Sequence, residues 1–99
     1  MSHPATVLLV RFSSPLSFEE VQNVINQRIG EFRALRGLTQ KYYLQDEVTG
    51  EYAGLYLWES PEALDDFRDS ELRKTIARAY RAQGEPRIEV YKVFDILRP

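Results

Sequence analysis

Aromatic side chains that also carry a polar group are concentrated between residues 41 and 60, in the segment KYYLQDEVTGEYAGLYLWES. This segment contains four of the six tyrosines and the single tryptophan of the chain. Trp58, Tyr56 and Tyr42 are expected at alternate positions of two adjacent strands, where their N–H and O–H groups could donate hydrogen bonds to a bound carbonyl or phenolate. Packing in a core or an interface explains the same rings more simply, because strands favour aromatic residues for packing alone.

Few other residues are candidates for chemistry. Arg11 is the one charge in an otherwise aliphatic first strand, and it is a candidate for stabilising an anion. Lys41 and Tyr43 are expected on the opposite face from Trp58, as solvated surface. The only histidine, His3, lies in the N-terminal tail, which argues against catalytic triads, histidine metal sites and haem ligation.

Motifs for other chemistries do not occur in the sequence. The chain has no cysteine, which excludes disulfides and thiolate sites, and it has no Gly-rich phosphate loop, nucleophile elbow or metal-binding motif. The acidic pairs at 46–47 and 65–66 and the basic residues between 73 and 81 are expected to be solvated charge.

Length and charge limit the class of protein. The 99 residues fit one domain, residues 1–99, and a net charge of −2 argues against a nucleic-acid partner. No apolar run approaches the roughly 20 residues of a membrane span, so no membrane partner is expected. The N-terminal residues lack the pattern of a signal peptide, and a cytoplasmic location is predicted.

Hydrophobic spacing and capping residues predict an α+β protein. A capping box at Ser17 and Glu20 starts a helix that Gly37 ends, and Gly50 serves a hairpin between two strands. Ser60 with Pro61, and then Ser70, start two shorter helices, the second of which is expected to end at Gly84. The predicted strands are 5–13, 38–47, 51–59 and 86–97. The order β-α-β-β-α-β is ferredoxin-like, with a four-stranded antiparallel sheet.

Helices cover one face of such a sheet, and the other face is left bare. Strict alternation places Leu38, Tyr42 and Leu44 on one side of the second strand, and apolar residues remain on both faces of the third and fourth strands. A homodimer in which two sheets face each other would cover this surface. The space between the sheets, lined partly by tyrosine and tryptophan, is then a candidate pocket for a small aromatic molecule.

The stretch GLTQKYYLQDEVTGEYAGLYLWESPEALDDF resembles the core signature of the YdhR-like monooxygenase family. This family belongs to the dimeric α/β-barrel superfamily of antibiotic-biosynthesis monooxygenase-like proteins, and KVFDIL resembles its last strand. The matching residues are Gly37, Leu38, Lys41, Tyr42, Asp46, Glu47, Gly50, Gly54, Tyr56, Leu57, Trp58, Glu59, Ala63 and Phe67.

The resemblance implies a homodimer with a cavity between sheet and helices. It also implies oxidation of polycyclic phenols by O₂ with no metal, flavin or haem cofactor, because the deprotonated substrate supplies the electrons. Haem-degrading relatives rely on a histidine and an asparagine in the first strand, and ATVLLVRFS contains neither.

The sequence therefore predicts a cofactor-independent monooxygenase acting on a small aromatic or polyketide-like substrate. The predicted substrate-binding residues are Trp58, Tyr56, Tyr42 and Arg11. A non-catalytic ligand-binding or structural dimer is the alternative, and another small-molecule reaction on this scaffold, such as isomerisation, is a third possibility.

Overall fold

The computed structural model describes residues 3–98, and its four strands form one antiparallel sheet. The strands lie in the order β2-β3-β1-β4. Their bounds are β1 (Thr6–Ser13), β2 (Leu38–Gln45), β3 (Tyr52–Trp58) and β4 (Gln83–Lys92). This order places the two central strands, β1 and β3, side by side and antiparallel. The ferredoxin-like α+β fold predicted from the sequence is confirmed.

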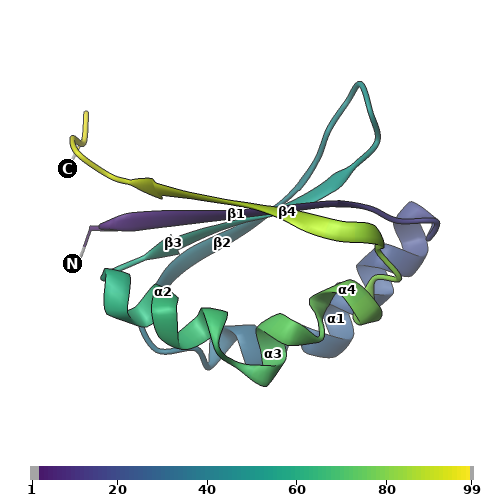
Figure 1. Cartoon of the computed structure of the whole chain (residues 1–99), viewed down its shortest axis with the longest axis horizontal. Coiled ribbons are helices and arrows are strands. Elements are labelled where there is room, and N and C mark those ends of the chain that lie inside the picture. The colour runs from purple at the N-terminus through teal and green to yellow at the C-terminus, as the bar shows by residue number, and fades with distance from the viewer. Residues whose placement is uncertain (1–2, 99) are drawn as a thin grey trace.

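The helices lie on one face of the sheet, and the other face carries no helix (Figure 1). Their bounds are α1 (Phe18–Arg33), α2 (Pro61–Arg68), α3 (Glu71–Lys74) and α4 (Ile76–Ala79). The capping box at Ser17 is present, and the hydroxyls of Ser60 and Ser70 cap α2 and α3 as predicted. Within residues 3–98, no helix combines the length and the apolar character that a membrane crossing requires.

The last helical segment is shorter than predicted, and it is divided. Thr75 ends α3 and begins α4, and Arg28 of α1 donates hydrogen bonds to the carbonyl and the hydroxyl of Thr75. Helix α4 ends at Ala79, and Arg81 adopts a left-handed backbone conformation with φ of 52°. The expectation that the helix ends at Gly84 is therefore wrong, because the chain has already entered β4 at Gln83.

The predicted final strand also has different bounds. Strand β4 covers Gln83–Lys92, whereas the sequence predicted residues 86–97. It pairs with β1 from Thr6 to Ser13, and because Lys92 is already opposite Thr6, the first residue of β1, the residues that follow lie beyond that strand. Phe94 and Leu97 are consequently exposed at the end of the chain.

The core lies between the helices and one face of the sheet. Residues at every second position of β1 point into it, with Leu8, Val10 and Phe12 buried. Their neighbours Val7, Leu9 and Arg11 are partly exposed on the other side, which we call the open face. In β3, Tyr56 and Trp58 belong to the buried core, so both rings lie on the helix-covered face.

A β-bulge at the start of β2 changes which residues face the helices. Leu38 is paired with Trp58, but Gln40 is paired with Leu57, so Thr39 is an extra residue in the ladder. Beyond it, Lys41 is paired with Tyr56, and Tyr42 with Leu55. Because one inserted residue exchanges the two faces of a strand, Lys41 lies on the helix-covered face and Tyr42 on the open face.

Two expectations are corrected by this register. Tyr42 does not share a face with Tyr56 and Trp58, whereas Lys41 and Tyr43, which were expected on the other face, do share it. The rings of Tyr56 and Trp58 also cannot line a space between two facing sheets, since they point toward the helices.

Candidate functional site

A cavity of about 150 Å³ lies between the helices and the helix-covered face of the sheet. Apolar side chains of β1 and α1 form much of its wall, and Val21 and Ile25 reach it together because they are four residues apart on α1. The polar side chains that reach the cavity are Gln22, Lys41, Gln45 and several tyrosines. An apolar hollow with a few polar groups is the usual form of a small-molecule site, and this volume holds about one aromatic ring.

Lys41 places an amine at this cavity, in an enclosure of three aromatic rings. Its Nζ lies 3.5 Å from the ring centre of Phe32, 4.4 Å from that of Tyr43 and 4.5 Å from that of Tyr56. Ring faces attract an ammonium group, by about 0.5–2 kcal/mol for each favourable contact. The ion pairs formed within residues 3–98 do not include Lys41, so no carboxylate balances its charge there.

The surroundings of Lys41 favour its neutral form. Burial lowers the pKa of Lys41 from 10.5 to about 7, because the charged amine loses its hydration, and the charge of Arg28 lowers it further. An amine with a pKa near neutrality can accept a proton from a bound molecule and can return it to water. Lys41 is therefore the group at this cavity best suited to acid–base chemistry.

Tyr56 connects the cavity with the aromatic core. Its ring is almost fully buried and lines the cavity, and it is stacked on Trp58 at 6.2 Å with an interplanar angle of 6°. Burial raises the pKa of Tyr56 far above its usual range, so its hydroxyl stays protonated and can donate a hydrogen bond. Tyr56 is the one predicted binding residue that lines this cavity.

Trp58 lies behind Tyr56 and has no exposed surface. Its ring centre is 5.2 Å from that of Phe67 of α2, and it does not line the cavity. The indole Nε1 is buried without a hydrogen-bond partner among residues 3–98. In this structure Trp58 supports the ring of Tyr56, and direct contact with a ligand stays a prediction.

Gly54 provides the space that Lys41 and Tyr56 occupy. A Cβ atom at this position would lie 2.9 Å from Cε1 of Tyr56 and 3.4 Å from Cε of Lys41. The first distance is shorter than real Cβ contacts, so any larger residue would displace the tyrosine ring. A glycine here thus allows an aromatic ring and a lysine stem to lie against the same stretch of backbone.

Tyr42 and Arg11, the other two predicted binding residues, lie on the open face. Tyr42 is 50% exposed, and neither residue lines the cavity. A binding role for them stays a prediction, and it would require a second subunit over this face.

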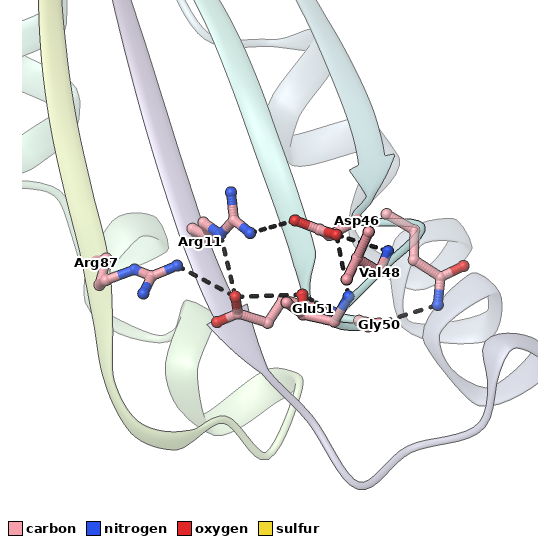
Figure 2. Close-up of polar contacts among 8 residues, drawn as sticks. Arg11, Asp46, Val48, Gly50, Glu51 and Arg87 are labelled. Atoms are coloured by element: carbon pink, nitrogen blue, oxygen red, sulfur yellow. Dashed lines mark hydrogen bonds and ion pairs between the residues drawn. The ribbon is translucent and has the colours of Figure 1, made fainter.

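Arg11 is held by carboxylates at the base of the β2–β3 hairpin (Figure 2). Its Nη2 pairs with Asp46, and its Nε lies 3.2 Å from Glu51 Oε1, which also accepts a hydrogen bond from Arg87 of β4 at 3.1 Å. Backbone N–H groups of Thr49 and Val48, together with Arg11, lower the pKa of Asp46 to about 2. The guanidinium therefore joins three strands, and its charge is already balanced.

Sequence reasoning missed Lys41 because it missed the bulge. Strict alternation from Leu38 places Tyr42 on the covered face and Lys41 on the solvent-exposed face. No glycine or proline stands at position 39 to indicate an inserted residue. One signal in the sequence was compatible with burial of Lys41. The residues two positions before and after it, Thr39 and Tyr43, are not acidic, so neither could form an ion pair with it.

Structural comparison connects this fold with oxygenases. No protein-family model and no curated protein matches the sequence. SnoaB, a cofactor-independent oxygenase from Streptomyces nogalater, is similar with a TM-score of 0.73 at 14% identity, over 95% of this chain and 97% of that chain. A proposed antibiotic biosynthesis monooxygenase from Caulobacter crescentus is similar with a TM-score of 0.73 at 17% identity, over 95% and 94% of the two chains.

A third similar structure is NE2512 from Nitrosomonas europaea, a protein of unknown function. It has a TM-score of 0.77 at 14% identity and covers 100% of this chain and 98% of its own. At these low identities the TM-scores show a shared fold, and structures named as antibiotic biosynthesis monooxygenases are among those that have it. Membership of the YdhR-like family stays a prediction from the sequence.

Proposed function

We propose that the protein is a cofactor-independent monooxygenase that oxidises a small aromatic or polyketide-like molecule with O₂ in the cytoplasm. The cavity supports this most directly: it is apolar, about one ring in size, and lined by Lys41 and Tyr56. The fold that contains it is also the fold of a cofactor-independent oxygenase. A deprotonated phenol or enol can itself give an electron to O₂, so the protein has to desolvate, orient and hold an anion.

The residues around the cavity suit these tasks. The apolar wall of β1 and α1 removes water from the bound ring, and the Tyr56 hydroxyl offers a hydrogen bond to an oxygen of the substrate. For a methylene activated by an adjacent ring, the carbon loses two hydrogen atoms and gains one oxygen atom, and the second oxygen atom leaves as water. Every electron in this reaction comes from the substrate.

Oxygen uptake with a panel of phenols, naphthols and anthrones tests the proposal. Val21→Phe would fill the cavity from α1, whereas Val48→Phe makes the same change at the exposed hairpin. We expect uptake by the wild type and by Val48→Phe, and its loss in Val21→Phe when circular dichroism shows an intact fold. If the wild type consumes no oxygen with any compound, a non-catalytic ligand-binding or structural protein is the better description.

We also propose that the protein is a homodimer in which two open faces meet. Tyr42, Leu44 and Tyr91 are exposed on this face, at 50%, 43% and 50%, beside partly exposed aliphatic residues of β1 and β3. Contiguous apolar surface of this kind usually marks an interface. Such a dimer would bring Tyr42 and Arg11 against a partner subunit, where their predicted binding role could be exercised.

Sedimentation velocity tests the dimer. Leu55 lies on the open face between Leu9 and Tyr42, so Leu55→Glu places a charge in the proposed interface. We expect a dimer for the wild type and for the control Val48→Glu, and a monomer for Leu55→Glu. A monomeric wild type at micromolar concentration would contradict the proposal.

A further inference from the structure

Lys41 is unlike the other two lysines of the chain. Lys74 forms an ion pair with Glu71 at 3.7 Å, and Lys92 is exposed at the end of β4. Lys41 has its amine among three rings and forms no ion pair within residues 3–98. Enclosing an amine without an anion costs free energy, so function explains this residue better than stability does.

Among the described residues, the groups that line the two hollows beside Lys41 or act on its charge include no anion. The titratable and charged side chains are Arg28 and Arg33 of α1, Arg73 of α3, Tyr43 of β2, Tyr56 of β3 and Tyr80 after α4. Burial raises the pKa of Tyr43 and Tyr56, and it raises the pKa of Tyr80 to about 12, so these hydroxyls are neutral near pH 7. The region around Lys41 therefore carries positive charge without a counter-charge, and a bound anion could supply it.

Lys41 also lies at the boundary between two hollows. Its side chain lines the apolar cavity and, on the other side, a more open groove of about 330 Å³ between α1 and β2. Thr39, Gln40 and Arg33 line that groove, and the first two are exposed to water. A proton taken up by Nζ from the cavity can therefore leave toward solvent without passing the bound molecule.

We propose that Lys41 is the proton acceptor of this cavity, and that its ligand is a small phenol or enol held as the anion against the resulting ammonium. The O–H bond of the ligand breaks, an N–H bond forms at Nζ, and no electron moves in this step. As the first step of an oxygenation it rests on the proposed function, but the proton transfer itself needs no O₂.

The Lys41 amine suits a ligand with one ionisable hydroxyl on a single ring. The cavity holds about one aromatic ring, and Tyr56 lines the same space as the amine. An anion bound there would be stabilised by the ammonium, by the Tyr56 hydroxyl and by the positive charge of Arg28. A neutral, non-ionisable ring of equal size would gain none of these interactions.

The test is a spectroscopic titration with para-nitrophenol under nitrogen, because its phenolate absorbs visible light and its phenol does not. We expect the apparent pKa of the bound phenol to fall by about one unit or more, which is at least a tenfold preference for the phenolate. Lys41→Met should abolish this shift and weaken phenolate binding about tenfold or more, while the control Lys92→Met changes neither. Lys41→Arg keeps a cation and should restore the shift, but arginine cannot act as a base, so neutral-pH oxygen uptake should stay low.

Each outcome separates the two proposals. An equal shift in the wild type and Lys41→Met, or no saturable binding of the phenol by the wild type, overturns the role of Lys41. A Lys41-dependent shift without oxygen uptake on any phenol supports the anion site at Lys41 and contradicts the monooxygenase. Oxygen uptake that is unchanged in Lys41→Met supports the monooxygenase and contradicts the proton acceptor.

Discussion

Two cations on one sheet have opposite electrostatic surroundings. Arg11 lies on the open face and pairs with Asp46 and Glu51, which raises the pKa of its guanidinium through those hydrogen bonds. Lys41 lies on the helix-covered face among aromatic rings, where burial lowers its pKa to about 7. Arg11 therefore holds strands together with a permanent charge, whereas Lys41 carries a charge that can change at neutral pH.

The two faces also differ in how their aromatic residues are used. Trp58 is fully buried against Tyr56 and Phe67, while Tyr42 is half exposed on the open face. The covered face derives its stability from ring packing, and the open face keeps its rings available for contact. The following substitutions test this contrast.

The largest effect is expected from removing a ring on the covered face. Trp58→Ala should lower the free energy of unfolding by about 3–5 kcal/mol, because it leaves a cavity among Tyr56, Phe67 and their neighbours. Tyr42→Ala, at an exposed position, should cost less than about 1 kcal/mol in a monomeric background such as Leu55→Glu. Urea unfolding followed by fluorescence for Tyr42→Ala and by circular dichroism for both variants measures this. Equal costs would mean that the two faces are packed alike.

The next largest effect is expected from removing the Lys41 amine, which forms no ion pair within residues 3–98. Between about pH 7 and 10.5 the unfolded chain holds a proton on Lys41 that the folded chain has released, so stability should rise with pH in this window. Lys41→Met should remove this dependence and stabilise the protein by roughly 2–4 kcal/mol near pH 6, where the folded amine must carry its charge. Denaturation at a series of pH values measures both.

Arg11→Met is the matched change on the open face, and its effect on the free energy of unfolding should have the opposite sign. It removes the cation that pairs with Asp46 and leaves Glu51 with Arg87 alone, so it should destabilise the protein, and added salt should reduce the difference. If Lys41→Met were also destabilising near pH 6, the contrast between the two cations would fail.

A smaller effect is expected at the glycine between Lys41 and Tyr56. Gly54→Ala introduces a Cβ at 2.9 Å from the tyrosine ring and should cost about 1–3 kcal/mol through displacement of that ring. Gly30→Ala on α1 meets nothing within 4 Å, and should instead stabilise the protein by about 1 kcal/mol because alanine favours the helix. Thermal unfolding of the two variants gives the comparison, and opposite signs are the expected result.

The smallest effect is expected at the hairpin. Asp46→Asn keeps an oxygen for the N–H groups of Val48 and Thr49 but loses the charge that pairs with Arg11. Because the folded pKa of Asp46 is about 2, below its ordinary value of 3.8, its contribution is present above 3.8 and is lost as the pH falls through about 2. The melting temperature of Asp46→Asn should be slightly lower near neutrality and should converge with the wild type in acid.

The fold was predictable because its signals are local. The capping box at Ser17 and the caps at Ser60 and Ser70 begin helices where the sequence places them, and Gly50 with a φ of 77° forms the hairpin turn. The order of strands and helices then leaves few arrangements. The boundaries of the last helix and strand were wrong, because Arg81 breaks the helix without a glycine or proline to announce it.

The site was predictable only in part, because it depends on pairing between strands. Tyr56 reaches the cavity as expected, but the faces assigned to Tyr42 and Lys41 were exchanged by one inserted residue at Thr39. Periodicity within a strand specifies which residues alternate, and the register against the neighbouring strand specifies which set is covered. The enclosure of Lys41 by Phe32, from a different helix, is a tertiary contact that no local pattern encodes.

The bulge at Thr39 selects one of two registers in which β2 could pair with β3. Without the bulge, Thr39 itself would pair with Leu57, and the register beyond it would turn Tyr42 and Leu44 inward and Lys41 and Tyr43 outward. The contents of the cavity and of the open face would thus be exchanged together by a shift of one residue in the pairing, whereas deletion of Thr39 would leave Lys41 opposite Tyr56. The register of one strand therefore decides whether this amine is enclosed or exposed, with no substitution of any residue that surrounds it.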